Sequence, residues 1–203
     1  MLELIVATKN KKKLKEIWEI LRGFNLKLSS LVDYSRAPRI IENGKTFKDN
    51  AVKKAVKIAR FSKKLVLGED SGLCVNALSG APGVYSSRFS GKNKSDIRNN
   101  LKLLKLLRGL PLNKRKAYYI CAVALADEHG LLGVVEGKCR GAIGFVLKGS
   151  RGFGYDPLFV IPKYNKTFAQ LGEKIKYGMS HRYHALSKAK KIIQKYIEKH
   201  KGN

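Results

Sequence analysis

The alternation of short apolar segments with amphipathic ones limits the folds open to this chain more than any other feature. Residues Leu2 to Ala7 are mostly apolar, and this segment has the length of one buried strand. Apolar side chains then recur at helical spacing, at Leu14, Ile17, Trp18 and Leu21. A buried strand followed by an amphipathic helix is typical of α/β proteins, in which helices cover a sheet.

Two further helices and a strand continue the pattern. Thr46 and Asp49 have the spacing of a capping box that opens a helix, and residues Leu65 to Leu67 predict the next strand. The apolar face of that helix consists of Phe47, Ala51, Ala55, Ile58 and Ala59. Ser95 is expected to cap a leucine-rich helix that ends near Gly109 and whose apolar residues are Ile97, Leu101, Leu104 and Leu107.

The second half of the chain predicts a hairpin and a C-terminal helix. Residues Tyr118 to Ala126 and Leu131 to Lys138 form two strands joined by a short polar turn. A glycine-rich loop, Gly149 to Gly154, precedes an apolar segment from Leu158 to Ile161, and the last helix begins at Ser180. No repeat, linker or low-complexity tract is present, so we expect one α/β domain with a mixed sheet over residues 1–203.

Charge is the unusual feature of the composition. The chain of 203 residues has 42 Lys and Arg against 15 Asp and Glu, a formal net charge of +27. Such a field attracts polyanions, for example nucleotides, nucleic acid or acidic lipid headgroups. A hydrophobic content of 44% and a mean hydropathy of -0.26 exclude a disordered, collagen-like or membrane-embedded chain.

The cysteines and the apolar segments indicate an intracellular compartment. Cys74, Cys121 and Cys139 are an odd number with no close pair, which predicts reduced core residues and neither a disulfide framework nor a zinc site. The longest apolar run, Ala117 to Ala126, has ten residues and is too short to span a bilayer. We therefore expect a cytoplasmic protein.

A cluster of polar and basic residues follows the first predicted strand. Thr8-Lys9-Asn10-Lys11-Lys12-Lys13 places a hydroxyl, an amide and several ammonium groups at the start of a helix, where free N–H groups and the helix dipole favour anions. The segment lacks the pattern of a Walker loop. It predicts a phosphate-binding site, and the alternative is an ordinary N-cap with solvated lysines.

Three acids occur where solubility does not require them. Glu42 lies in Glu42-Asn43-Gly44, and Glu69 and Asp70 follow the strand at Leu65 to Leu67 directly. Carboxylates after a strand of an α/β fold lie at the edge where ligands bind, and hard oxygen ligands suit Mg²⁺. The alternative is that these acids pair with surface lysines.

A third group combines glycines, aromatic residues and a possible helix start. It consists of Gly152-Phe153-Gly154-Tyr155-Asp156-Pro157 and Ser180-His181-Arg182. Such a loop can bring a ring and a carboxylate close to a planar ligand, while His and Arg supply hydrogen-bond donors. The group predicts a pocket for a nucleobase, against the alternative of simple loop packing and a surface histidine.

Six motifs in order along the chain resemble those of the inosine triphosphate pyrophosphatase family. They are Thr8-Lys9-Asn10 with Lys13, Glu42-Asn43-Gly44-Lys45-Thr46-Phe47 with Asn50-Ala51 and Lys54-Ala55, Glu69-Asp70-Ser71-Gly72-Leu73, Gly80-Ala81-Pro82-Gly83 with Tyr85-Ser86, Phe153-Gly154-Tyr155-Asp156-Pro157, and Ser180-His181-Arg182. The resemblance implies a Mg²⁺-dependent homodimer that cleaves non-standard purine nucleoside triphosphates (ITP, dITP, XTP) into monophosphate and pyrophosphate. The fold it implies is an elongated mixed sheet flanked by helical lobes, with a central active-site cleft.

The resemblance also implies a role for each site residue. The triphosphate would be held by Thr8, Lys9, Asn10, Lys11, Lys12, Lys13 and Lys54. The metal would be held by Glu42 and Asp70, with Glu69 as a further candidate, and Asp70 would also be the base that activates water. The base pocket would contain Phe153, Gly154, Tyr155, Asp156, Lys176, His181 and Arg182, with Ser71 near the substrate.

Three residues depart from the family's pattern, and two other functions stay open. Lys9 replaces a frequent glycine, Glu69 replaces a frequent Asp, and Tyr177 stands where Ser is usual, so that Lys174 is an alternative to Lys176. The chain could instead be a related pyrophosphatase for other modified or pyrimidine triphosphates, or a basic nucleic-acid-binding protein. Non-specific attraction of nucleic acid by the charge is expected with any of these functions.

Overall fold

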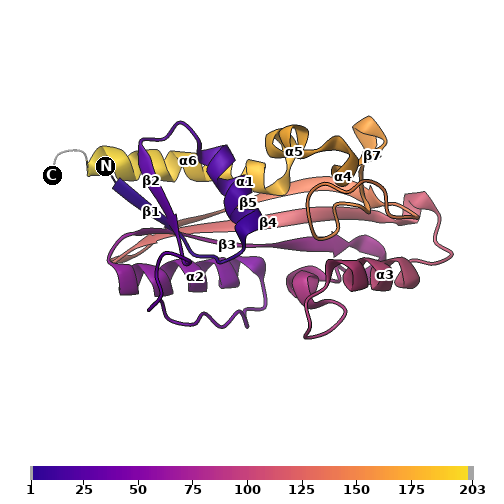
Figure 1. Ribbon diagram of the computed structural model, residues 1–203, viewed down its shortest axis with the longest axis horizontal. Helices are drawn as coiled ribbons and strands as arrows, with labels where there is room; N and C mark the ends of the chain where they lie inside the picture. The colour runs from indigo at the N-terminus through magenta and orange to yellow at the C-terminus, as the bar shows by residue number, and fades with distance from the viewer. Residues whose placement is uncertain (1, 201–203) are drawn as a thin grey trace. The chain divides into compact units, whose positions relative to one another are not determined.

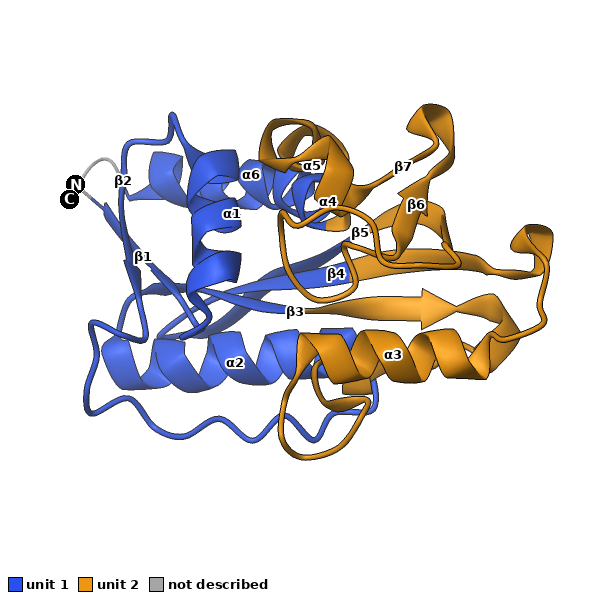
Figure 2. Cartoon of the chain, turned by 45° about the vertical axis from the view of Figure 1, so that its right-hand side comes forward, with its two compact units in different colours: residues 1–70, 121–137, 182–203 blue, residues 71–120, 138–181 orange. Residues whose placement is uncertain are grey.

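The computed structural model describes residues 2–200 and divides the chain into two compact units (Figure 2). Unit 1 comprises residues 1–70, 121–137 and 182–203, and unit 2 comprises residues 71–120 and 138–181. Strands β3, β4 and β5 contribute residues to both units. The expectation that residues 1–203 act as one domain stays a prediction.

Within residues 2–200, the strands form one seven-stranded mixed sheet in the order β2-β1-β3-β4-β5-β6-β7 (Figure 1). The strands are β1 (Leu2–Val6), β2 (Leu26–Ser30), β3 (Leu65–Val75), β4 (Lys116–Asp127), β5 (Gly130–Ile143), β6 (Phe159–Ile161) and β7 (Lys166–Thr167). The first strand is parallel to both β2 and β3, whereas β6 is antiparallel to β5 and β7. This confirms the predicted α/β fold with a mixed sheet.

Three helices pack on the sheet in unit 1: α1 (Lys11–Leu21), α2 (Phe47–Ser62) and α6 (His181–Lys199). Helices α1 and α6 lie on one face and α2 on the other (Figure 2). The contact of α2 with β3 is close, since a Cβ built on Gly68 would lie 2.1 Å from the carbonyl oxygen of Ala51. A side chain at position 68 would therefore push α2 off the sheet.

Local signals begin both N-terminal helices, as the sequence predicts. Thr46 and Asp49 form the complete capping box at the start of α2. Asn10 caps α1, because its side-chain oxygen accepts hydrogen bonds from the backbone N–H groups of Lys12 and Lys13. Each cap satisfies donors that have no partner within the helix.

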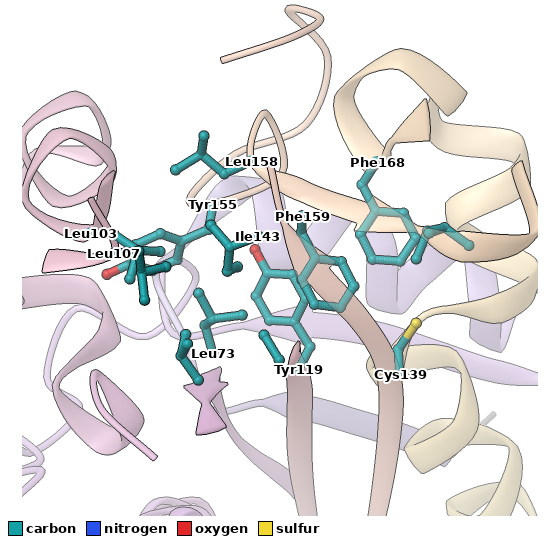
Figure 3. Close-up of a cluster of buried hydrophobic side chains, with 13 residues drawn as sticks. Leu73, Leu103, Leu107, Tyr119, Cys139, Ile143, Tyr155, Leu158, Phe159 and Phe168 are labelled. Carbon is teal, nitrogen blue, oxygen red and sulfur yellow. The ribbon is translucent and has the colours of Figure 1, made fainter. Parts of the chain in front are cut away.

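Unit 2 has its own hydrophobic core, built around Tyr119, Phe159 and Phe168 (Figure 3). Its helices are α3 (Asp96–Leu106), α4 (Phe168–Leu171) and α5 (Glu173–Met179). Arg115 is buried next to this core and donates hydrogen bonds to the carbonyl oxygens of Leu107, Ile143 and Gly144. One side chain thus satisfies carbonyl groups at the end of α3 and at the end of β5.

The predicted strand at Leu65 to Leu67 was too short. Strand β3 continues to Val75, so Glu69 and Asp70 lie within the strand and not after it. Polar residues are tolerated there because each has cationic partners from neighbouring helices. What does end at Leu67 is the pairing with β1, whose last residue, Val6, is opposite Leu67.

Two further elements differ from the sequence analysis. Strand β2 was missed, since its second half, Ser29 and Ser30, is polar in sequence but buried at the parallel pairing with β1. The leucine-rich helix α3 is present and is capped by Ser95, but Ile97 and Leu101 are exposed. Its buried residues are Asn99, Asn100 and Leu103, and the two amides bond to backbone carbonyls of unit 2.

Other expectations from the sequence are confirmed. The hairpin of β4 and β5 is longer at both ends than predicted, and its turn is closed by Asp127, which accepts hydrogen bonds from the N–H groups of His129 and Gly130. All three cysteines are free and buried. Among residues 2–200, no helix combines the length and the apolar character that crossing a membrane requires.

Candidate active site

The centre of the candidate site in unit 1 is Asp70, which is 7% exposed. One of its carboxylate oxygens is 3.0 Å from Nζ of Lys54, and the other accepts a hydrogen bond of 3.1 Å from the amide of Asn50. Both partners lie on the buried face of α2, one turn apart. Helix α2 thereby fixes the orientation of the Asp70 carboxylate on β3.

Glu42 approaches the same lysine from the loop before α2. Its carboxylate is 2.8 Å from Nζ of Lys54, so Glu42 and Asp70 share one ammonium group. The loop is tied to α2 by a bond of 2.8 Å from the N–H of Gly44 to Asn50. A Cβ on Gly44 would lie 2.7 Å from Asn50, and a side chain there would break this contact.

Glu69 points to the opposite face of β3, as alternation along a strand requires. Its two oxygens are 2.8 Å from Nζ of Lys13 and 2.9 Å from a guanidinium nitrogen of Arg182. Arg182 also pairs with Glu16 of α1, and the thiol of Cys121 lies 3.3 Å from Glu69. The result is a buried cluster of alternating charges that joins β3, α1 and α6.

Burial and neighbouring charges have opposite effects on the pKa of three buried groups, Asp70, Lys54 and Arg182. Burial raises the pKa of Asp70, while Lys54 and Lys13 lower it. Burial by itself lowers the pKa of Lys54, but the charges of Asp70 and Glu42 outweigh it and raise the pKa above the ordinary value. The pKa of Arg182 is likewise raised, since Glu69 and Glu16 outweigh the cost of burial. Lys54 and Arg182 therefore stay cationic.

The segment predicted to bind phosphate connects the end of β1 to α1. The side chain of Asn10 caps the helix, and the hydroxyl of Thr8 accepts a hydrogen bond of 3.2 Å from the N–H of Asn10. Lys9, Lys11 and Lys12 are exposed, whereas Lys13 reaches inward to Glu69. Helix α1 has no acid in its first turn that would compete with an anion.

The carboxylates of unit 1 fit a magnesium ion. Glu42 and Asp70 converge on one cation, Lys54, and Glu42 is partly exposed, so that water can complete an oxygen shell. Glu69 is fully buried and both of its oxygens already have cationic partners, and its role as a further ligand stays a prediction. Across residues 2–200, no group of three or more His, Cys, Asp or Glu side chains is arranged to hold a metal.

A second cluster of predicted site residues lies in unit 2. Asp156 is buried, and one oxygen of its carboxylate is 2.6 Å from Nζ of Lys176 and accepts a hydrogen bond of 2.9 Å from the N–H of Phe153. The ammonium group of Lys176 lies 4.6 Å from the centre of the Phe153 ring. Of the two candidate lysines, Lys176 is buried against Asp156 and Lys174 is exposed.

His181 belongs to the same cluster through a residue that sequence analysis missed. The imidazole of His181 stacks on the ring of Tyr119, with centroids 4.6 Å apart and planes at 11°. The hydroxyl of Tyr119 is 3.5 Å from the second oxygen of Asp156. In sequence Tyr119 is one of several apolar residues in a strand, and no local signal distinguishes it from the rest.

Four predicted residues have other surroundings. The hydroxyl of Tyr155 donates to the carbonyl of Ser86 within the core, where Figure 3 shows it beside Leu103 and Leu107. Gly154 is tied to α3, since its N–H donates to Asp96. Ser71 is half-buried in β3 next to Asp70, and Arg182 pairs with carboxylates of unit 1. Their predicted contacts with substrate stay predictions.

Comparison with known proteins identifies the family to which the chain belongs. The model of the Ham1 family matches residues 4–192. A dITP/XTP pyrophosphatase of Desulforamulus reducens is 46% identical over 194 residues, which are 96% of each chain. A dITP/XTP pyrophosphatase of Exiguobacterium sibiricum is 44% identical over 97% of this chain and 99% of its own.

Solved structures have the same fold. A HAM1 protein of Coxiella burnetii superposes with a TM-score of 0.87 at 36% identity, covering 96% of this chain and all of its own. A nucleoside-triphosphatase, or dITP/XTP pyrophosphatase, of Mycobacterium abscessus superposes with a TM-score of 0.76 at 37% identity, covering 93% and 98%. The family match, the near full-length identity and the shared fold lead to one conclusion: this chain belongs to the Ham1 family.

Proposed function

We propose that this protein hydrolyses non-standard purine nucleoside triphosphates (ITP, dITP and XTP) to the monophosphate and pyrophosphate, and so removes them from the nucleotide pool. The observation that carries the proposal is the near full-length similarity to dITP/XTP pyrophosphatases. Asp70 with Lys54 and Glu42 supports it, because the cluster combines a buried carboxylate with the cation that a triphosphate substrate requires.

The residues of unit 1 bind the triphosphate in this proposal. The start of α1 presents the ammonium groups of Lys9, Lys11 and Lys12 and the positive end of the helix dipole to an anion, next to Thr8 and Asn10. Lys13 and Lys54 add two cations held at fixed positions by Glu69 and Asp70. Several positive charges neutralise the leaving pyrophosphate without covalent chemistry.

Asp70 serves as the general base and Glu42 as its partner in holding Mg²⁺. A magnesium ion held by these two carboxylates would neutralise phosphate charge and lower the pKa of water. Asn50 and Lys54 keep the carboxylate of Asp70 in one orientation, so it can accept a proton from water that attacks phosphorus. No nucleophilic side chain takes part.

The residues of unit 2 bind the nucleobase. Phe153 supplies an aromatic face, Asp156 and Lys176 an acceptor and a donor, and His181 a ring nitrogen. Hypoxanthine and xanthine present an acceptor at O6, which such donors satisfy, whereas the amino group of adenine leaves donors unpaired at about 1 to 3 kcal/mol each. In this proposal Gly154 and Tyr155 shape the loop that carries Phe153. Ser71 and Arg182 stay predicted substrate contacts.

One assay tests the reaction and the substrate class together. The purified protein is incubated with Mg²⁺ and ITP, dITP, XTP, GTP, ATP or a pyrimidine triphosphate, and both pyrophosphate and orthophosphate are measured. We expect pyrophosphate as the first product and kcat/KM for ITP about 100-fold or more above that for ATP. Orthophosphate as the first product contradicts the proposal, and preference for a pyrimidine triphosphate supports the related pyrophosphatase instead.

We further propose a cytoplasmic homodimer. Its support is the outer face of α3, which exposes Ile97 and Leu101, one turn apart, beside basic residues. Apolar side chains grouped on one exposed helix are typical of protein interfaces. A Leu101→Lys variant should then sediment as a monomer in analytical ultracentrifugation, and an unchanged sedimentation coefficient places the interface elsewhere.

A further inference from the structure

Tyr119 contacts two polar groups of the unit 2 cluster, His181 and Asp156. It is 7% exposed and belongs to β4, in the core of unit 2. Its ring is packed against Phe159 at 4.6 Å and lies 6.3 Å from Phe168, and Figure 3 shows the three rings together. The position of Tyr119 is therefore set by the core and not by a ligand.

The face of this ring determines the plane of the His181 imidazole. The two rings are almost parallel, at 11°, with centroids 4.6 Å apart. His181 is the first residue of α6, so the backbone fixes where the side chain begins but leaves its ring free to rotate. A flat aromatic surface removes that freedom, since rotation out of the stack would clash with Tyr119.

The hydroxyl of Tyr119 makes a second, weaker contact. At 3.5 Å from Oδ1 of Asp156 it is at the limit of a hydrogen bond. Oδ2 of the same carboxylate takes the bonds from Lys176 and Phe153. The hydroxyl of Tyr119 thus faces Oδ1, whereas Lys176 and Phe153 bond to Oδ2. The stack of Tyr119 on His181 is a stronger constraint than this long hydrogen bond.

We propose that Tyr119 is a positioning residue for base selection: its ring holds the imidazole of His181 in the plane in which it meets a purine O6. This rests on the proposed function, in which His181 faces the base. Recognition of O6 by a donor depends on direction, and a misplaced donor loses selectivity before it loses the chemistry at the phosphates. Tyr119 touches neither substrate nor metal in this proposal.

Two variants separate the ring from the hydroxyl. Tyr119→Phe keeps the stack and should retain the wild-type ratio of kcat/KM for ITP over ATP within about 3-fold. Tyr119→Leu removes the aromatic surface and should lower this ratio about 10-fold or more, through a loss on ITP with ATP hydrolysis nearly unchanged. An unchanged ratio in folded Tyr119→Leu overturns the proposal.

A matched control accounts for lost packing. Leu107 is fully buried in the same core and lies beside Tyr155, apart from Tyr119 (Figure 3), so Leu107→Ala should lower Tm and leave the ITP over ATP ratio unchanged. An equal fall of the ratio in Leu107→Ala would show that the selectivity follows core stability, and would overturn the assignment to Tyr119.

NMR of the wild-type protein tests the stack without any unstable variant. The ring protons of His181 should be shifted upfield relative to those of the exposed His129, and the shift should persist in Tyr119→Phe. A His181→Gln variant assigns the signal. An unshifted His181 signal overturns the proposal. A different result would overturn the proposed function: wild-type enzyme that does not release pyrophosphate from ITP.

Discussion

Glu69 and Asp70 show how neighbouring residues of one strand serve different purposes. Alternation turns Asp70 toward α2, where Lys54 and Asn50 hold it, and turns Glu69 toward α1 and α6, where Lys13 and Arg182 hold it. Each acid is buried with a cation, which is the condition under which carboxylates are tolerated in a core. We therefore expect removal of the Asp70 charge to affect turnover most, and removal of the Glu69 charge or its partner to affect stability most.

Replacement of Asp70 tests the proposed general base. Asp70→Asn keeps the shape of the side chain but removes the charge that pairs with the buried Lys54, so the protein should stay folded with a lower Tm. Turnover of ITP should fall about 100-fold or more, because the amide cannot accept the proton from water. Pyrophosphate release and a thermal melt measure the two effects. Near-normal turnover would remove Asp70 from the centre of the mechanism.

Replacement of Arg182 tests the buried charge cluster. Arg182→Ala leaves the carboxylates of Glu16 and Glu69 without their shared guanidinium, and breaking a buried pair costs about 3 to 5 kcal/mol. Urea unfolding should show this loss, with a smaller one for Arg182→Lys, which keeps the charge. An unchanged free energy of unfolding would mean that the cluster does not depend on Arg182.

At the scale of elements, Glu3 joins the first two strands and the segment before β3. Its carboxylate accepts hydrogen bonds from Ser29 of β2 at 2.6 Å, from Tyr34 at 2.9 Å and from Lys64 at 2.5 Å. Burial alone would raise the pKa of Glu3, but these hydrogen bonds outweigh it and lower the pKa from 4.5 to about 2. The ionised form is thus favoured by the fold.

A pH dependence follows from this lowered pKa. A carboxylate with a depressed pKa in the folded state stabilises the fold above its ordinary value of 4.5, and this contribution is lost as pH falls toward 2. The difference in unfolding free energy between wild type and Glu3→Gln should be largest above about pH 5 and should shrink steadily on acidification. Urea titrations from pH 3 to pH 7 measure it.

The control for this pH series is Glu19→Gln. Glu19 lies on α1, and its carboxylate is 3.6 Å from the guanidinium group of Arg22. Both side chains are exposed, and an exposed ion pair of this kind contributes little to stability. Its replacement should change the unfolding free energy by less than about 0.5 kcal/mol at every pH. If the difference in unfolding free energy between wild type and Glu3→Gln stays constant down to pH 3, the lowered pKa of Glu3 is not the cause of the pH dependence.

The net charge of +27 acts at the scale of the whole molecule. Exposed lysines of α6 include Lys188, Lys191, Lys195 and Lys199, which lie three or four residues apart on one face. A basic face of this kind attracts phosphates whatever their source. The charge therefore predicts nucleic-acid binding as a consequence of composition, separate from the enzymatic site.

Binding to duplex DNA should depend on salt and not on sequence. Because phosphate contacts carry no base information, affinity should fall about 100-fold or more between 50 and 200 mM salt, and it should be equal for unrelated duplexes. Fluorescence anisotropy with two duplexes of different sequence measures both. Sequence-selective binding at physiological salt would instead favour the nucleic-acid-binding function.

The sequence by itself determined the features that depend on neighbouring residues. The capping box of Thr46 and Asp49, the helical spacing in α1 and α6, and the β4–β5 hairpin all follow from residues a few positions apart. The six motifs also led to the Ham1 family, because their order is carried by the sequence alone. These predictions needed no knowledge of which elements meet.

Only the tertiary structure decided which polar groups meet. Glu69 is compatible with the interior of a long strand because Arg182, 113 residues away, and Lys13, 56 residues away, neutralise it. Tyr119 has no local signal, and its relation to His181 exists only once the core of unit 2 forms. Burial makes an unpaired charge costly, so the partners of such groups are set by packing between distant segments, which local patterns do not encode.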